Sequence, residues 1–158
     1  MAKELKITAI SKEEQYIQLI PQVKALLSDE NDAISNMANI CAALKFGMSF
    51  FWVGFYLVKE NQLVLGPFQG PVACTRIDFG KGVCGSAWQK KHVLIVPDVE
   101  QFSGHISCNS LSKSEIVIPL VDSNQKVIGV LDVDSDKLNN FDNIDERYLI
   151  EILSYLVI

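Results

Sequence analysis

Three of the chain's four cysteines lie in one stretch, from Val72 to Glu115, which we interpret as a thiol redox site. Cys74, Cys84 and Cys108 form a C-x9-C-x23-C pattern, and each has small or polar neighbours. A cysteine that is oxidised to sulfenic acid condenses with a second thiol to a disulfide. Two cysteines therefore complete one turnover, and a third can pass the disulfide to an external dithiol. We expect this stretch to carry the chemistry.

The surroundings of the cysteines indicate which thiol is reactive. Cys108 lies near His105 in a long polar loop, about Pro97 to Lys113. Loops of this length are commonly functional, and an accessible cysteine in a polar setting favours its thiolate. Cys84 is the main rival, because it falls in the first turn of a predicted helix, where the dipole favours an anion. Cys41, on a predicted helix stripe, is assigned to the core.

Composition limits the class of protein. The 158 residues are 49% hydrophobic and 21% charged, which is typical of one soluble globular domain, here residues 1–158. A net charge of -5 argues against nucleic acid as a partner. The uncharged run from Phe46 to Val58 is too short to span a membrane, and the N-terminus lacks a secretory signal. We therefore expect a cytoplasmic location, where disulfides are transient, catalytic or redox-sensing.

Hydrophobic periodicity and turn residues predict the elements that position the cysteines. A helix begins at Ser11, with Glu14 completing a capping box, and Pro21 either kinks or splits it. The later elements are a helix over Ala33–Lys45, a hairpin of Phe50–Lys59 and Leu63–Leu65, an irregular loop over Gly66–Pro71, a strand over Val72–Ile77 that carries Cys74, a short helix over Gly82–Lys90, a strand over His92–Val96, a hairpin of Ser114–Leu120 and Lys126–Val133, and a last helix from Phe141–Asp142.

This order of elements predicts an α+β domain. Hairpins require antiparallel pairing, and the apolar stripes of the terminal helices need a sheet face to cover. We expect one central antiparallel sheet with the terminal helices on one face. The middle loops then cross the opposite face, where a small ligand would be enclosed.

Several segments resemble GAF domains. They are the F-W-V-G-F-Y strand at Phe51–Tyr56, the strand Ile118–Leu120 followed by Val127–Asp132, and Phe141 before the closing helix. Within that group L-G-P-F-Q-G-P-V-A-C, G-x-G-V-C-G and the H-I-x-C motif ending at Cys108 are similar to free methionine-(R)-sulfoxide reductases. The resemblance covers nearly the whole chain. GAF domains in general lack the C-x9-C-x23-C pattern of Cys74, Cys84 and Cys108.

The resemblance implies a cofactor-free enzyme that reduces free L-methionine-R-sulfoxide, an oxidative-stress repair reaction, and is regenerated by thioredoxin. Cys108 corresponds to the attacking sulfur, and Cys74 and Cys84 to the resolving cysteines, in an order that stays open. Glu115, Asp132 and Asp134 match acidic residues of the family pocket. Trp52 matches an aromatic wall. The resemblance also makes a homodimer a reasonable expectation.

These residue types suit the implied reaction. A buried carboxyl group among other carboxylates has a raised pKa, so Glu115 can stay protonated and supply the proton for the departing oxygen. Asp132 and Asp134 share one face of a strand and, with Glu115, would bind the ammonium of a free amino acid. Trp52 and Tyr56 also share a face and would hold the S-methyl end.

Other interpretations compete with this one. Trp52 and Tyr56 could be core residues, and Asp132 and Asp134 could simply end a strand. A zinc site of the three cysteines with His105 is disfavoured, because the chain has no C-x2-C pair. The whole protein could instead be a non-catalytic GAF module that binds a small ligand, or a redox sensor whose disulfide changes an interface.

Overall fold

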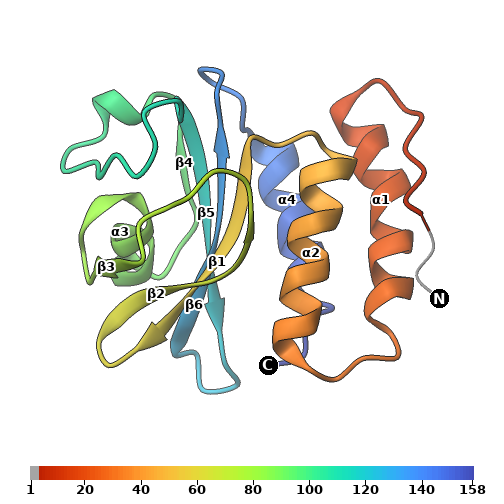
Figure 1. Cartoon of the computed structure of the whole chain (residues 1–158), viewed down its shortest axis with the longest axis horizontal. Coiled ribbons are helices and arrows are strands. Elements are labelled where there is room, and N and C mark those ends of the chain that lie inside the picture. The colour runs from red at the N-terminus through yellow and green to blue at the C-terminus, as the bar shows by residue number, and fades with distance from the viewer. Residues whose placement is uncertain (1–3) are drawn as a thin grey trace.

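The computed structural model describes residues 4–158 and confirms the predicted α+β class (Figure 1). Its elements are α1 (Lys12–Leu27), α2 (Ala33–Gly47), β1 (Trp52–Lys59), β2 (Gln62–Gln69), β3 (Arg76–Asp78), α3 (Gly82–Lys90), β4 (Leu94–Val96), the 3-10 turn η1 (Val99–Gln101), β5 (Ser114–Val121), β6 (Val127–Ser135) and α4 (Asn143–Leu153). One six-stranded antiparallel sheet has the order β3-β2-β1-β6-β5-β4. Figure 1 shows α1, α2 and α4 on one side of this sheet and α3 with the middle loops on the other.

The helical layer forms where the sequence predicts it. Ser11 caps α1 by accepting a hydrogen bond from the Glu14 backbone, and Asp32 caps α2 in the same way. The helix α1 continues through Pro21, so it is not split there. Pro21 lies on the exposed side, and the buried stripe opposite it packs on α2 and α4. Packing thus keeps the helix whole despite one missing backbone donor. None of the helices in residues 4–158 is long and apolar enough to cross a bilayer.

Alternation along the strands divides the interior into two cores. Val53, Phe55 and Val133 point toward the terminal helices and belong to the larger core. Trp52 and Tyr56 point the other way and belong to a second core, which also contains Cys84 at the start of α3. Because successive strand residues face opposite sides, every polar side chain on the second face is directed toward α3 and the loops.

Two predicted strands have different limits in the structure. The segment expected as an irregular loop, Gly66–Pro71, lies largely within β2, which pairs with β1 as far as Gln69. Gly66 and Pro67 together oppose Phe55, forming a β-bulge that tolerates a residue without a backbone donor. In contrast β3 is only Arg76–Asp78. The prediction that Cys74 lies on a strand is therefore wrong, and this cysteine lies in the connection between β2 and β3.

The remaining boundaries differ by a few residues. Phe50 and Phe51 precede β1, and β4 begins at Leu94 rather than His92. The strand β6 extends to Ser135, two residues beyond the prediction. Asp132 and Asp134 therefore lie inside β6, not at a strand end that enters a turn.

Candidate active site

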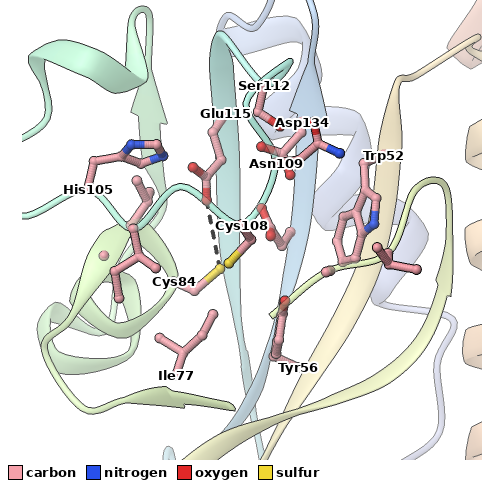
Figure 2. A pocket seen from close by; sticks show the side chains of 16 residues that line it. Trp52, Tyr56, Ile77, Cys84, His105, Cys108, Asn109, Ser112, Glu115 and Asp134 are labelled. Carbon is pink, nitrogen blue, oxygen red and sulfur yellow. Dashed lines mark hydrogen bonds between the residues drawn. The ribbon is translucent and has the colours of Figure 1, made fainter. Parts of the chain in front are cut away.

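A pocket lies on the α3 face of the sheet, between the central strands and the middle loops (Figure 2). Its cavity volume is about 40 Å³. Seven of the predicted site residues line this pocket, namely Trp52, Tyr56, Cys84, Cys108, Glu115, Asp132 and Asp134. The eighth, Cys74, is joined to it through a covalent bond to Cys108. The structure thus brings together residues from β1, α3, β5, β6 and two loops.

Cys74 and Cys108 form a disulfide, with their Cα atoms 5.2 Å apart. They are 34 positions apart in the chain. Both residues are half-buried, so an external thiol can approach the bond from solvent. Sequence reasoning left open whether Cys74 or Cys84 pairs with Cys108, and the structure pairs it with Cys74.

Cys84 is a free thiol at the base of the pocket. Gly85 lets α3 approach β3 closely, since a Cβ there would lie 2.4 Å from the Asp78 carbonyl oxygen. The Cys84 thiol is buried and donates a hydrogen bond to Glu115 Oε1 over 3.8 Å (Figure 2). Burial, then the charges of Asp132 and Glu115, raise the pKa of the Cys84 thiol well above its usual value. This is the opposite of the shift expected from the helix dipole. Cys41 is also buried and free, which confirms its assignment to the core.

The three acidic side chains come from two paired strands. Glu115 on β5 is opposite Asp134 on β6, and Asp132 is opposite Val117, so all three point to the same face. Burial raises the pKa of Asp132 to about 6. Burial and the neighbouring carboxyls Asp132 and Asp134 raise the pKa of Glu115 well above its usual value, and burial with Asp132 does the same for Asp134. Of the three carboxyl groups, Asp132 therefore has the pKa that burial raises least, and it is the member that loses its proton most readily.

Asp132 also has an unused acceptor. Its Oδ1 atom is buried and has no hydrogen-bond partner among the described residues. A buried acceptor without a partner costs free energy, so it marks a place where a bound group would be stabilised.

One side of the pocket is aromatic. The Trp52 indole donates a hydrogen bond to the Pro71 carbonyl over 2.9 Å and stacks between Phe68 and Tyr56, with ring centroids 5.5 and 6.1 Å away. Tyr56 donates its hydroxyl hydrogen to the Cys74 carbonyl over 2.9 Å. Gly54 leaves room for the indole, because a Cβ there would lie 2.2 Å from the ring. Trp52 and Tyr56 are therefore core residues and pocket walls at once.

Loop residues complete the pocket, and sequence reasoning did not single out most of them. Asn109 and Ser112 lie beside Asp134, and His105 lies on the opposite side of the cavity (Figure 2). Ile106 contributes an apolar part of the rim. The polar loop was recognised as functional, yet which of its side chains face inward depends on the path of the loop and has no periodic signal.

Two sets of residues bear on metal binding. The predicted alternative of three cysteines with His105 is not supported, because Cys74 and Cys108 are bonded to each other. In residues 4–158 a different set has suitable donors. One atom each of Cys84, Glu115 and Asp132 lies within 4.8 Å of the others.

Comparisons with known proteins agree with this geometry. The GAF-domain family model matches residues 28–158. The chain is 64% identical over 157 residues to GAF domain-containing protein A of Dictyostelium discoideum, covering 99% of each chain. It is 43% identical over 148 residues to the free methionine-R-sulfoxide reductase of Escherichia coli, covering 93% of this chain and 89% of that protein.

A solved structure is similar over almost the full length. The X-ray structure of free methionine-R-sulfoxide reductase from Neisseria meningitidis in complex with its substrate matches with a TM-score of 0.94 and 48% identity, covering 99% of this chain and 93% of that one. Fold, pocket and sequence identity over nearly the whole chain lead to one assignment: the chain belongs to the free methionine-R-sulfoxide reductase family of GAF-domain proteins.

Proposed function

We propose that this protein reduces free L-methionine-R-sulfoxide to L-methionine, with Cys108 as the nucleophile and Cys74 as the resolving cysteine. The observation that carries the proposal is the Cys74–Cys108 disulfide at a pocket that holds a cluster of carboxyl groups. Two proteins that are named for this reaction are 43% and 48% identical to the chain over the aligned residues. Cys108 is half-buried in a polar loop, which favours it as the nucleophile over the fully buried Cys84.

The reaction balances with two cysteines. The Cys108 thiolate attacks the sulfoxide sulfur, and the sulfoxide oxygen takes a proton from Glu115. This oxygen then passes to Cys108 Sγ as the bonds from the substrate sulfur to the oxygen and to Cys108 break, so methionine leaves and Cys108 becomes a sulfenic acid. The Cys74 thiol then displaces water from that sulfenic acid and forms the disulfide. The net change is one sulfoxide and two thiols converted to one thioether, one disulfide and one water. The raised pKa of Glu115 keeps its proton available near neutral pH.

The pocket has features that would select a free amino acid. Asp132 would accept hydrogen bonds from the substrate ammonium, and Asp134 would lie beside it. The Trp52 and Tyr56 rings would contact the S-methyl end. A peptide nitrogen carries no charge, so a methionine sulfoxide residue within a protein would lose the ionic contact.

Turnover requires removal of the disulfide. We propose thioredoxin as the dithiol reductant, because a half-buried disulfide can be attacked by an external thiolate through a mixed disulfide. The same proposal places the protein in the cytoplasm, where thioredoxin keeps thiols reduced. A homodimer is proposed from the family resemblance alone.

The decisive experiment is thioredoxin-coupled NADPH consumption with three substrates in parallel. They are free L-methionine-R-sulfoxide, the S epimer, and the N-acetylated R-sulfoxide. We expect turnover of the free R epimer alone. Turnover of the acetylated compound at an equal rate would contradict the role of the acidic cluster, although the reductase activity would stand. No turnover of any compound, from a protein with its cysteines shown to be reduced, would favour a redox sensor or a ligand-binding module.

A further inference from the structure

Cys84, Glu115 and Asp132 meet at one point although they come from three different elements. Cys84 lies on α3, Glu115 on β5 and Asp132 on β6, and their donor atoms all lie within 4.8 Å of one another. Each of the three residues is at least nine-tenths buried. The helix α3 packs on β5 and β6, and this packing encloses the free Cys84 thiol among carboxyl groups.

The spacing is close to that of a metal centre. In a tetrahedral zinc site, bonds of about 2.3 Å to sulfur and about 2.1 Å to oxygen separate the two ligand atoms by about 3.6 Å. The Cys84 Sγ and Glu115 Oε1 atoms are 3.8 Å apart. Only a small side-chain adjustment would therefore bring both atoms into the coordination sphere of one ion.

A second observation points to a missing partner at the same place. Asp132 is 7% exposed, and its Oδ1 has no hydrogen-bond partner in the described part of the chain. A cation bound between Asp132 and Cys84 would satisfy this oxygen. A thiol beside two carboxyl groups is a mixed ligand set, which favours a borderline or soft ion over Mg²⁺ or Ca²⁺, since those ions take oxygen ligands.

We propose that Cys84, Glu115 and Asp132 form a binding site for one thiophilic divalent cation, Zn²⁺ or Cd²⁺. Three protein ligands leave a fourth position open toward the pocket, which water would occupy. The ion would replace the protons of the Cys84 thiol and the Glu115 carboxyl and release them to solvent. No sulfur changes its oxidation state in this step. The ion would occupy the place assigned above to the substrate ammonium, so it would act as a reversible inhibitor.

The test measures metal binding directly. The full-length protein is prepared with the Cys74–Cys108 disulfide intact and titrated with Cd²⁺, whose bond to thiolate gives an ultraviolet charge-transfer band. Zn²⁺ binding is measured by competition with a chromophoric chelator. We expect one ion per chain and a thiolate band in the wild-type protein. Cys84→Ser should abolish the band. Asp132→Asn should weaken binding by at least about tenfold, because substitution of a residue that only supports a metal ligand already costs about that much affinity, and loss of a ligand should cost no less.

Cys41→Ser is the matched control, since Cys41 is the other free and buried cysteine. The control should bind Cd²⁺ like the wild-type protein. A band that persists in Cys84→Ser, equal affinity in Asp132→Asn, or no band in the wild-type protein would overturn the proposal. The readout does not depend on turnover. An inactive protein that still binds Cd²⁺ through Cys84 would contradict only the proposed reductase function.

Discussion

Cys84 and Cys108 carry the same thiol group in different surroundings. Cys108 is half-buried in a polar loop and bonded to Cys74, whereas Cys84 is buried and hydrogen-bonded to Glu115. Nucleophilic attack needs an accessible thiolate, and burial among carboxyl groups opposes ionisation. We therefore propose Cys108 as the attacking residue and Cys84 as a residue that positions the Glu115 carboxyl.

Cysteine variants separate these roles. In single turnover with prereduced protein, Cys108→Ser is expected to form no methionine. Cys84→Ala removes the hydrogen bond to Glu115 and should still form the Cys74–Cys108 disulfide, with a rate reduced roughly five- to tenfold, because one hydrogen bond contributes about 1 kcal/mol. Methionine release and thiol counts are measured together. Cys41→Ser should match the wild-type protein. Methionine formation by Cys108→Ser would show that another thiol attacks.

Asp132 gives a prediction about stability and pH. Burial raises the pKa of Asp132 to about 6, above its ordinary value of 3.8. The folded state therefore holds this proton more tightly than the unfolded state, and stability falls as pH rises between these two values. Asp132→Asn removes that loss. The free energy of unfolding of Asp132→Asn, minus that of the wild-type protein, should be greater at pH 8 than at pH 5, by on the order of 1 kcal/mol.

Urea unfolding at the two pH values measures this difference. Asp136→Asn, at an exposed position one residue past β6, is the control and should show no such change. An equal stability difference at both pH values for Asp132→Asn would mean that Asp132 has an ordinary pKa in the folded protein.

At the scale of elements, β1 carries the aromatic wall and fixes its orientation. Trp52 lies flat over Gly54, and its indole is held by the Pro71 carbonyl. Gly54→Ala should force the ring to move, because the new Cβ would lie 2.2 Å from it. We expect kcat/KM for the free sulfoxide to fall on the order of tenfold to 100-fold, since displacement of a positioning group by about 1 Å can cost that much.

Steady-state kinetics and tryptophan fluorescence check this prediction together. Gly66→Ala is the matched control on β2, where a Cβ would meet Phe55 and Leu57 rather than Trp52. It should cost stability without changing the fluorescence or KM. Equal kinetic losses in both variants would mean that a general loosening of the sheet, and not the position of Trp52, explains the effect.

The elements also show what sequence can and cannot predict. Period-two alternation predicted that Asp132 and Asp134 share one face, because side-chain direction in a strand is a local property. That Glu115 points to the same face depends on the register between β5 and β6. The bulge at Gly66–Pro67 was missed, since glycine and proline indicate a loop unless a long neighbouring strand such as β1 continues the ladder. The contact between Cys84 and Glu115 depends on how α3 docks against β5, which no local pattern records.

At the scale of the whole molecule, the sheet separates a stabilising layer from a reactive one. The larger core lies between the sheet and the helices α1, α2 and α4, and the described site residues lie on the other side (Figure 1). Asp145 is the main polar group of the helical layer. It is buried and accepts hydrogen bonds from Tyr16, over 2.8 Å, and from Lys12, over 2.6 Å. These contacts join α1 to α4 between residues that are 129 and 133 positions apart in sequence.

Tyr16→Phe tests that separation. The substitution keeps the ring, which stacks on Tyr148, but removes the hydroxyl and leaves Asp145 Oδ1 without its donor. The free energy of unfolding should fall by about 1.5–3 kcal/mol, the cost of a lost hydrogen bond to a charged group. Urea unfolding measures this loss of stability.

The pocket lies beyond the sheet, so kcat/KM of Tyr16→Phe for methionine sulfoxide should stay within about twofold of wild type under conditions where the variant is folded. A larger kinetic loss in the folded variant would mean that the helical layer sets the geometry of the site through β5 and β6, because α4 packs directly on β5.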